Sequence, residues 1–398
     1  PKALEETGTD PGRVRQAFAM AVPKTGAKVV PGDLDIRLEN SITKVEKEMW
    51  NNLMGAHGVM DWDGLLFLEN SFQGNDLKEH NWEFRYLIIR DGKGKPILAT
   101  FMTLGLWKDD MLAKESISKT LEQTRKYDPY HLTARALSLG SLFTEGNHLY
   151  LDRKHPLKDR ALNILMWTME TLGLKMGAKM TVLRDFGPDE ELGKFFKDQG
   201  FVRIHMPNSC AVDLIGRMDV ETYFSQLSVR NRRHFRKEIL AFEPEFQVDI
   251  LASCHREQLQ QLIALYGNVH RNNLGLNTFS FPQRVFENMS DNPHWEFIVL
   301  TLKSSPQTPI GAMFCYKNQG KTYVPAFVGL DYTYVTSHYT YRQLLYQTIK
   351  RAIALGFSGI HFGLTASFEK RKLGSEVNER FAYVQASDNY VLELLGTM

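Results

Sequence analysis

Residues 329–374, GLDYTYVTSHYTYRQLLYQTIKRAIALGFSGIHFGLTASFEKRKLG, decide the fold of this chain. They predict the end of a strand, an aromatic loop and then a helix whose hydrophobic side chains recur with a period of about 3.6 residues. The positions of this buried stripe are Leu344, Leu345, Thr348, Ile349, Ala352 and Ile353. Gly356 ends the helix, and a short strand and a charged turn around Lys370 follow. In open α/β sheets, such a strand–helix–strand unit carries the chemistry where its strands end.

The composition is that of an ordinary soluble globular protein. At 398 residues the chain is too long for one ordinary core, which predicts two domains. With 43% hydrophobic and 24% charged residues it is neither disordered nor fibrous, and a net charge of +2 is too small to indicate a nucleic-acid partner. Its 3 cysteines are widely spaced and indicate neither a disulfide framework nor a zinc motif. No apolar run approaches the roughly 18 residues of a membrane span, and we expect a cytoplasmic protein.

Two segments divide the chain. Residues 22–32 carry two prolines and two glycines and are typical of a linker. A strand ending in AVDLI meets a new helix start, MDVETYF, near Asp213. We therefore predict an N-terminal helix and linker at residues 1–34, a first domain at 35–214 and a second at 215–398. The sequence begins with Pro1 rather than Met, and we expect the chain to be a part or a processed form of a longer polypeptide.

The two predicted domains repeat one order of elements: a hairpin, a long helix, a short strand and a closing segment. In the first, the strands are expected at 83–89, 96–104, 134–151 and 180–183, and the helices at 157–176 and 189–199. In the second, strands at 297–302, 310–316 and 322–328 precede the unit at 329–374. Each half is thus predicted to form its own mixed sheet crossed by a central helix. The fold class is α/β with two copies of one small fold.

Four segments carry a resemblance to a known family. They are EELGKFFKDQGFVRIHMPNSCAVDL at 190–214, LSVRNRRHFRK at 227–237, GLDYTY at 329–334 and GLTASFEKRKLG at 363–374. Together they resemble the FemAB-like branch of the GNAT acyltransferase superfamily. The resemblance implies tandem GNAT-like domains that move an acyl or aminoacyl group from a carrier, foremost acyl-coenzyme A, to an amine, with no metal. The Gln/Arg-x-x-Gly-x-Gly/Ala loop that holds the coenzyme A pyrophosphate in ordinary GNAT enzymes is absent at 152–160 and 335–342.

A basic run precedes the second domain's sheet. Its cations are Arg230, Arg232, Arg233, Arg236 and Lys237. On a helix they share one side, and the hydrophobic residues of the segment share the other. A solvated charged face is one interpretation. The other is a phosphate-binding site for the donor, because clustered cations repel one another until an anion binds. We assign Arg232, Arg233, Arg236 and Lys372 to this site. An aminoacyl-tRNA partner ranks lower, since no aromatic-interleaved basic stripe extends the patch.

The aromatic loop at 331–341 supplies candidates for acid–base chemistry. Acyl transfer to an amine needs a base for the ammonium proton and an acid for the leaving group. Tyr339 and Asp331 could fill these roles at the strand end. The alternatives are a tyrosine that caps the sheet with its ring buried and an aspartate that serves the turn after Gly329.

The resemblance adds two further candidates. It places a functional lysine at Lys370, which could stabilise an oxyanion or clamp a phosphate, and it places a general base at Glu145. The alternative for Glu145 is a carboxylate that serves a turn. His361, inside the strand before Lys370, is expected to be a core histidine.

Two function classes remain. The first is an N-acyltransferase in which the amine attacks the carbonyl directly, because no Ser–His–Asp or Cys–His arrangement supplies a covalent nucleophile. Its acceptor would be a small-molecule amine or amino acid. The second is a noncatalytic GNAT-like module that binds a ligand or partner for an upstream enzyme domain, since some GNAT-like domains are fused behind pyridoxal-phosphate enzymes. An open cleft between the halves, with Lys370, a tyrosine and a carboxylate converging on it, would distinguish the enzyme.

Overall fold

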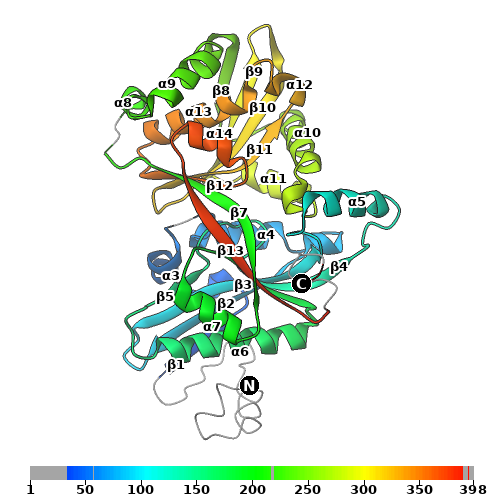
Figure 1. The fold of residues 1–398 in the computed structure, drawn as a ribbon, viewed down its shortest axis with the longest axis vertical. Coiled ribbons are helices and arrows are strands. Elements are labelled where there is room, and N and C mark those ends of the chain that lie inside the picture. Colours follow the sequence, from blue (N-terminus) through cyan, green and yellow to red (C-terminus); the bar gives the residue numbers. More distant parts are fainter. Residues whose placement is uncertain (1–33, 57, 217–218, 389–392, 394–398) are drawn as a thin grey trace, which may run out of the picture.

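The computed structural model describes residues 34–56, 58–216, 219–388 and 393. The helix and linker predicted at 1–34 lie outside the described residues, apart from Leu34. The molecule is elongated, with two α/β halves stacked along its long axis and the long strands β7 and β13 running between them (Figure 1).

The first half contains most of the predicted elements. In chain order they are β1 (Leu34–Glu39), η1 (Ile42–Lys44), α3 (Lys47–Met54), α4 (Trp62–Ser71), η2 (Lys78–His80), β2 (Glu83–Asp91), β3 (Pro96–Lys108), α5 (Glu115–Arg125), β4 (Thr133–Leu139), β5 (Leu149–Leu151), α6 (Lys158–Met176), β6 (Met180–Phe186), α7 (Glu190–Asp198) and β7 (Val202–Asp213). The hairpin β2–β3 and the helices α6 and α7 match their predicted ranges within a few residues. The strand pair predicted at 134–151 is wrong in its pairing, because β5 pairs with β3 and leaves β4 to pair with β3 and β6.

The second half follows the same order. Its elements are α8 (Val220–Ser225), α9 (Val229–Phe235), the π-helical turn η3 (Arg236–Leu240), η4 (Glu243–Glu245), β8 (Phe246–Leu251), α10 (Arg256–Asn272), η5 (Leu274–Leu276), α11 (Gln283–Ser290), β9 (Trp295–Leu302), β10 (Ser305–Lys317), β11 (Thr322–Leu330), α12 (Tyr332–Val335), α13 (Thr340–Ala354), β12 (Gly359–Leu364), α14 (Ser367–Lys372) and β13 (Glu376–Ala386). The charged turn predicted around Lys370 is wrong in conformation, since these residues form the short helix α14.

The strands form one continuous sheet. Among the described residues, its 13 strands run in the order β1-β2-β3-β4-β6-β13-β7-β12-β11-β10-β9-β8, with β5 beside β3. The prediction of a separate sheet in each half is therefore wrong, although the mixed α/β class is confirmed. The reason is β13, which leaves the second half and pairs with β6 and β7. Its Phe381 and Tyr383 are buried in the core of the first half. The chain division at 214/215 stays a prediction.

Central helices cover the sheet as the periodicity predicts. In α13, Leu344, Leu345, Ile349 and Ala352 are buried, and they pack with strand residues of the second half in one core cluster. The helix α6 buries the stripe that includes Leu162, Leu165 and Met169 against the first half. It ends at Gly177, whose left-handed φ of 68° suits a residue without a side chain.

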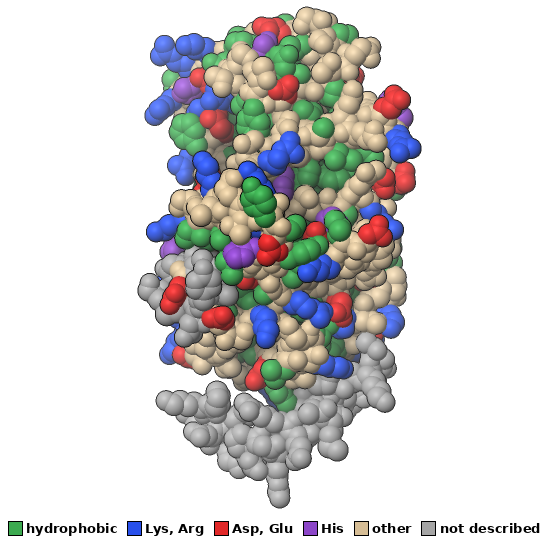
Figure 2. Space-filling model, turned by 90° about the vertical axis from the view of Figure 1, so that its right-hand side faces the viewer, with side chains coloured by type: hydrophobic (Ala, Val, Ile, Leu, Met, Phe, Trp, Pro, Cys, Tyr) green, Lys and Arg blue, Asp and Glu red, His purple; other side chains and the backbone are tan. Residues whose placement is uncertain are grey.

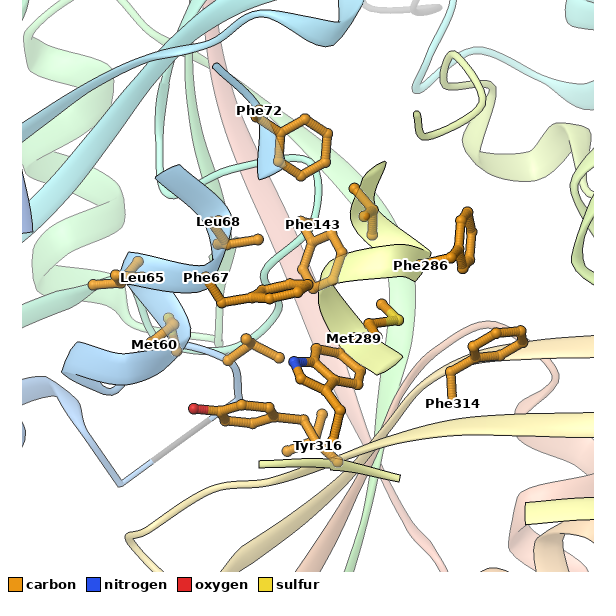
Figure 3. Close-up of a cluster of buried hydrophobic side chains, with 14 of the residues drawn as sticks. Met60, Leu65, Phe67, Leu68, Phe72, Phe143, Phe286, Met289, Phe314 and Tyr316 are labelled. Carbon is orange, nitrogen blue, oxygen red and sulfur yellow. The ribbon is translucent and has the colours of Figure 1, made fainter. Parts of the chain in front are cut away.

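A third hydrophobic cluster fixes one half against the other. It joins Phe67 of α4 and Phe143 to Trp295 of β9, with ring centroids 5.1 and 6.1 Å apart, respectively, from the Trp295 ring. Figure 3 shows Phe67 and Phe143 facing Met289 of α11 across this cluster. Because apolar packing holds the halves together, groups from both can form one rigid site. Within the described ranges, the structure has no helix long and apolar enough to cross a lipid bilayer.

Candidate functional site

A cavity of about 510 Å³ lies between the halves. It forms beside β11 and β12, which pair in parallel only at Thr322↔Gly359 and Tyr323↔Ile360. Residues that follow these pairs on both strands line the cavity instead of bonding to each other. Separated parallel strands thus open the sheet at the end where α/β folds place ligands.

Most of the cavity wall is apolar. The hydrophobic side chains include Leu142, Phe143, Tyr266, Phe281, Met313, Phe327, Val328, Leu330 and Leu345. The face turned toward the viewer in Figure 2 has a hollow in which hydrophobic side chains are visible. The polar residues Glu145, His361 and Lys370 also line the cavity. A ligand in this space therefore meets an apolar wall and a small set of charged or polar groups, which is the usual character of a small-molecule site.

Glu145 reaches the cavity from the first half, on the loop between β4 and β5. Its Oε2 accepts a hydrogen bond from the backbone N–H of Leu364, at 2.9 Å, on β12 of the second half. Burial, together with the negative charge of Asp185, raises the pKa of Glu145 to about 7, although the charge of Lys370 opposes the shift. A carboxyl group with this pKa exchanges a proton near neutral pH, as a general base must.

Lys370 approaches the same place from α14. Its side chain is buried, and its Nζ donates to the backbone oxygens of Phe362 and Leu364 at 2.8 Å and Thr365 at 2.9 Å. Burial lowers the pKa of Lys370, while the charge of Glu145 opposes that change. The three ammonium hydrogens are thus already used by the carbonyls. In this geometry Lys370 holds the end of β12 and places positive charge beside the cavity, rather than presenting a free donor to it.

The structure brings Glu145 and Lys370 together, but it leaves Tyr339 and Asp331 outside the cavity lining. The Tyr339 ring packs on Phe242 with centroids 5.1 Å apart and on the Arg342 guanidinium at 4.8 Å. Asp331 caps α12 by accepting the N–H of Thr333 at 2.9 Å. In the structure, Tyr339 therefore packs against its neighbours and Asp331 caps a helix, as the structural alternatives above describe.

Tyr341 belongs to the aromatic loop predicted at 331–341 but was not among the assigned site residues, and it lines the cavity from the first turn of α13. Burial raises its pKa, so its hydroxyl stays protonated. The signal was present: Tyr341 lies four residues before Leu345 and thus extends the hydrophobic stripe of the helix. His361, which was expected to be a core histidine, is only partly buried and also lines the cavity.

None of the predicted donor-binding cations lines the cavity: Arg233 and Arg236 are exposed, and Arg232 and Lys372 are partly buried. The amphipathic character of α9 is confirmed, because Phe235 is buried while Arg233 and Arg236 are exposed. No ion pair of Arg233 or Arg236 is found among the described residues. Part of the hydrogen-bonding capacity of Arg232 is already used within the protein, since its Nη1 donates to the carbonyl oxygen of Ser225 at 2.8 Å.

The basic residues of α9 lie next to the helix that carries Lys370. Asn231 of α9 donates to the backbone oxygen of Arg371 at 3.4 Å. Lys372 lies 3.5 Å from Glu369 and over the ring of the exposed Phe368, at 4.4 Å. We call Arg230, Arg233, Arg236, Lys237, Arg371 and Lys372 the basic face. Whether it binds a phosphate stays a prediction.

A buried polar cluster stands behind Glu145 and was not predicted. Asp185 lies 3.4 Å from Arg184 Nε and 3.8 Å from His148 Nδ1. Burial lowers the pKa of His148 to about 3, so this imidazole is neutral. Burial also raises the pKa of Asp185 against the effect of Arg184. The sequence signal was the polar pair Arg184–Asp185 at the end of a buried strand. None of the described residues forms a group of three or more His, Cys, Asp and Glu side chains able to hold a metal ion.

Comparison with known proteins agrees with this architecture. Residues 229–371 match the family described as an acetyltransferase (GNAT) domain. The structure is similar to that of FemX, with a TM-score of 0.57 and 12% identity over 88% of this chain and 98% of the other. It is also similar to L-PGS from Bacillus licheniformis, with a TM-score of 0.50 and 10% identity over 89% and 96%.

A third similar structure is a tandem GNAT protein from the clavulanic acid biosynthesis pathway, with a TM-score of 0.50 and 11% identity over 89% of this chain and 99% of the other. No curated protein matches the chain in sequence. At these identities the likeness to solved structures concerns the fold, and it extends over both halves. Residues 229–371 therefore match a GNAT domain, and the chain as a whole has a fold similar to those of FemX and of the tandem GNAT protein.

Proposed function

We propose that the protein is an N-acyltransferase that transfers an acyl group from acyl-coenzyme A to an amine, with Glu145 as the general base. The observation that carries the proposal is the position of Glu145. This carboxyl group lines an apolar cavity in a GNAT fold, and burial raises its pKa to about 7.

The chemistry follows from these groups. An amine enters as an ammonium ion, whose pKa is about 8 to 10, and must lose a proton before it can attack. Glu145 takes that proton, and the amine nitrogen forms a bond to the thioester carbon. The nitrogen, which is positively charged after bond formation, loses its second proton, and the carbon–sulfur bond of the tetrahedral intermediate breaks. The thiolate leaves and takes up the proton lost by the nitrogen, directly or through solvent. The positive charge of Lys370 favours the oxyanion electrostatically.

A covalent acyl-enzyme is less consistent with the residues present. Cys210 interacts with the Lys370 charge, but the thiol is buried and burial raises its pKa. The thiolate, not the thiol, is the reactive nucleophile. We therefore favour direct attack by the amine.

Two features support the choice of donor. The apolar cavity wall matches an acyl chain, because burying such a chain contributes about 0.8 kcal/mol for each methylene group. The basic face on α9, η3 and α14 includes residues of the helix that supplies Lys370, and its charge matches the phosphates of coenzyme A. The absent pyrophosphate loop makes this face the proposed phosphate contact.

The noncatalytic alternative has less support. A binding scaffold would fill the space between the halves with apolar side chains. Here Lys370, Tyr341 and Glu145 all line an open cavity of about 510 Å³. An upstream enzyme domain that supplies the amine is compatible with the proposed reaction.

The test is a matrix of acyl-coenzyme A donors, from acetyl to palmitoyl, against primary amines and amino acids. Release of free coenzyme A is followed with a thiol reagent, and products are identified by mass spectrometry. We expect amide formation that is lost in Glu145→Gln. Amide formation at the wild-type rate by Glu145→Gln would contradict the assigned base, and the absence of any acyl transfer would contradict the function.

A further inference from the structure

A second cavity, of about 500 Å³, lies in the first half at the end of β6. The loop between β4 and β5 separates it from the cavity between the halves. Glu145 of this loop lines the first cavity, and Asn147 lines the second. Between them Gly146 has a left-handed φ of 112°, which turns the chain. The second cavity is therefore adjacent to the proposed base.

A buried carboxylate with unused hydrogen-bonding capacity lies at the wall of this cavity, and its ion-pair contact is Arg184 Nε at 3.4 Å. Asp185 is 2% exposed and lines the cavity, and neither of its oxygens has a hydrogen-bond partner among the described residues. The nearby N–H of Gly146 lowers the pKa of Asp185 without reaching hydrogen-bond geometry. Its backbone adopts a left-handed φ of 66°, which non-glycine residues rarely adopt. Buried polar groups normally have partners, and strained residues gather at ligand sites.

A guanidinium group faces the same cavity from β13. Arg380 donates from Nε to Ser209 Oγ at 2.8 Å, and no further hydrogen bond or ion pair of its side chain is found among the described residues. Its Nη1 would lie 3.3 Å from a Cβ on Gly187, so the glycine leaves the approach to this nitrogen open. The two Nη groups are in the fork arrangement that binds a carboxylate through two hydrogen bonds.

Two carboxylates and two guanidinium groups line the cavity: Arg153 and Asp189 pair with each other, whereas Asp185 and Arg380 each have unused hydrogen-bonding capacity. Leu149 and Leu192 add an apolar wall. We propose that this cavity binds a free amino acid, with its carboxylate on Arg380 and its ammonium group on Asp185. The inference rests on the proposed function in one respect: it makes the amino acid the acceptor of the acyl group, bound in the cavity next to the loop that carries Glu145.

Binding is tested first, without a donor and without turnover. Isothermal titration calorimetry of the full chain uses alanine, serine and leucine, together with isoamylamine and N-acetyl-leucine. The last two probes keep the leucine side chain but lack the carboxylate and the free ammonium group, respectively. We expect at least one amino acid to bind and the two analogues to bind at least about tenfold more weakly than leucine, since each loses a charge-assisted contact.

Variants assign the contact to named residues. Arg380→Gln and Asp185→Asn should each weaken amino-acid binding about tenfold or more, and Arg380→Lys should retain more affinity than Arg380→Gln. Arg160→Gln, an exposed arginine on α6 outside the cavity, is the matched control and should bind like the wild type. Glu145→Gln should also bind like the wild type. Should Arg380→Gln fail to fold, Asp185→Asn and Arg380→Lys still decide the outcome.

The inference is overturned if none of the amino acids binds, or if Arg380→Gln and Asp185→Asn leave the affinity unchanged. Its failure is distinct from failure of the proposed function. Amino-acid binding without acyl transfer would retain the site and reject the reaction. Acylation of amines that lack a carboxylate, with an unchanged KM in Arg380→Gln, would retain the reaction and reject the site.

Discussion

The carboxylate of Glu145 and the backbone of Gly363 lie so close together that a Cβ on Gly363 would be 2.2 Å from Glu145 Oε2. The two residues come from different halves of the chain. Gly363 also has a left-handed φ of 70°, so a side chain there is excluded twice, by contact and by conformation. This position therefore fixes the Glu145 carboxylate at the end of β12.

Gly363→Ala should displace Glu145 and reduce both activity and stability. Gly356→Ala is the matched control, because Gly356 has a similar φ of 71° but a Cβ there meets nothing within 4 Å. The control should lose about 1 kcal/mol of unfolding free energy from backbone strain. Gly363→Ala should lose that amount and a further ~1–3 kcal/mol from overpacking. Urea denaturation measures the difference, and equal losses in the two variants would contradict the close contact.

Glu145 should make the folded protein less stable as the pH rises. Its pKa is about 7 in the fold and 4.5 in its unperturbed state, so the folded state binds the proton more tightly. Its contribution to stability is fully present below about pH 4.5 and is lost as the pH rises towards about 7. Glu145→Gln should remove this part of the pH dependence. Denaturation curves of both proteins across this range provide the test, and parallel pH profiles would contradict the raised pKa.

Activity should rise with pH as Glu145 ionises. The acid limb of kcat/KM should have its midpoint near the pKa of about 7. Asp185→Asn should move that midpoint to lower pH, because the charge of Asp185 is the second cause of the raised pKa after burial. Arg160→Gln should leave it in place. An acid limb that does not move in Asp185→Asn would exclude the electrostatic coupling.

Lys370→Met should reduce turnover by less than the roughly hundredfold cost of losing an oxyanion-hole donor, because Lys370 acts on the oxyanion through its charge and not through a hydrogen bond. It should also lower stability by roughly 1–3 kcal/mol, because the carbonyl oxygens of Phe362, Leu364 and Thr365 lose their buried donor. Lys175→Met removes an exposed positive charge on α6, outside the cavity and the basic face, and serves as the control. Normal turnover in a folded Lys370→Met protein would remove this lysine from the mechanism.

The basic face should contribute to donor binding through its charge. Replacing Arg233 and Arg236 by Gln should raise the KM for acyl-coenzyme A and reduce its dependence on salt, because the lost contacts are screened interactions. Replacing Arg160 and Lys175 by Gln changes the net charge equally on the exposed side of α6 and should not alter KM. If both double variants behave alike, the basic face acts only as a solvated surface.

Features that depend on residues close together in the sequence could be predicted from it. The period of α13, the β2–β3 hairpin and the strand ends followed from hydrophobic spacing and turn residues, and Glu145 and Lys370 came from the family resemblance. The positions of Asp185 and Arg380 could not be predicted, because they meet only after residues far apart in the sequence pair in the sheet. The chemistry expected of the aromatic loop favours Tyr339, but the helical period of α13 determines that Tyr341 is the tyrosine that lines the cavity.

The position of β13 between β6 and β7 determines the order in which this protein can fold. Until residues 376–386 have left the ribosome, the strands can form only two separate sheets, with open edges at β6 and β7. Open edges of this kind invite pairing with other chains, and closing such distant segments is slow. The sheet can therefore be completed only after both halves have been synthesised. Neither half can be excised near Asp213 without exposing an edge strand.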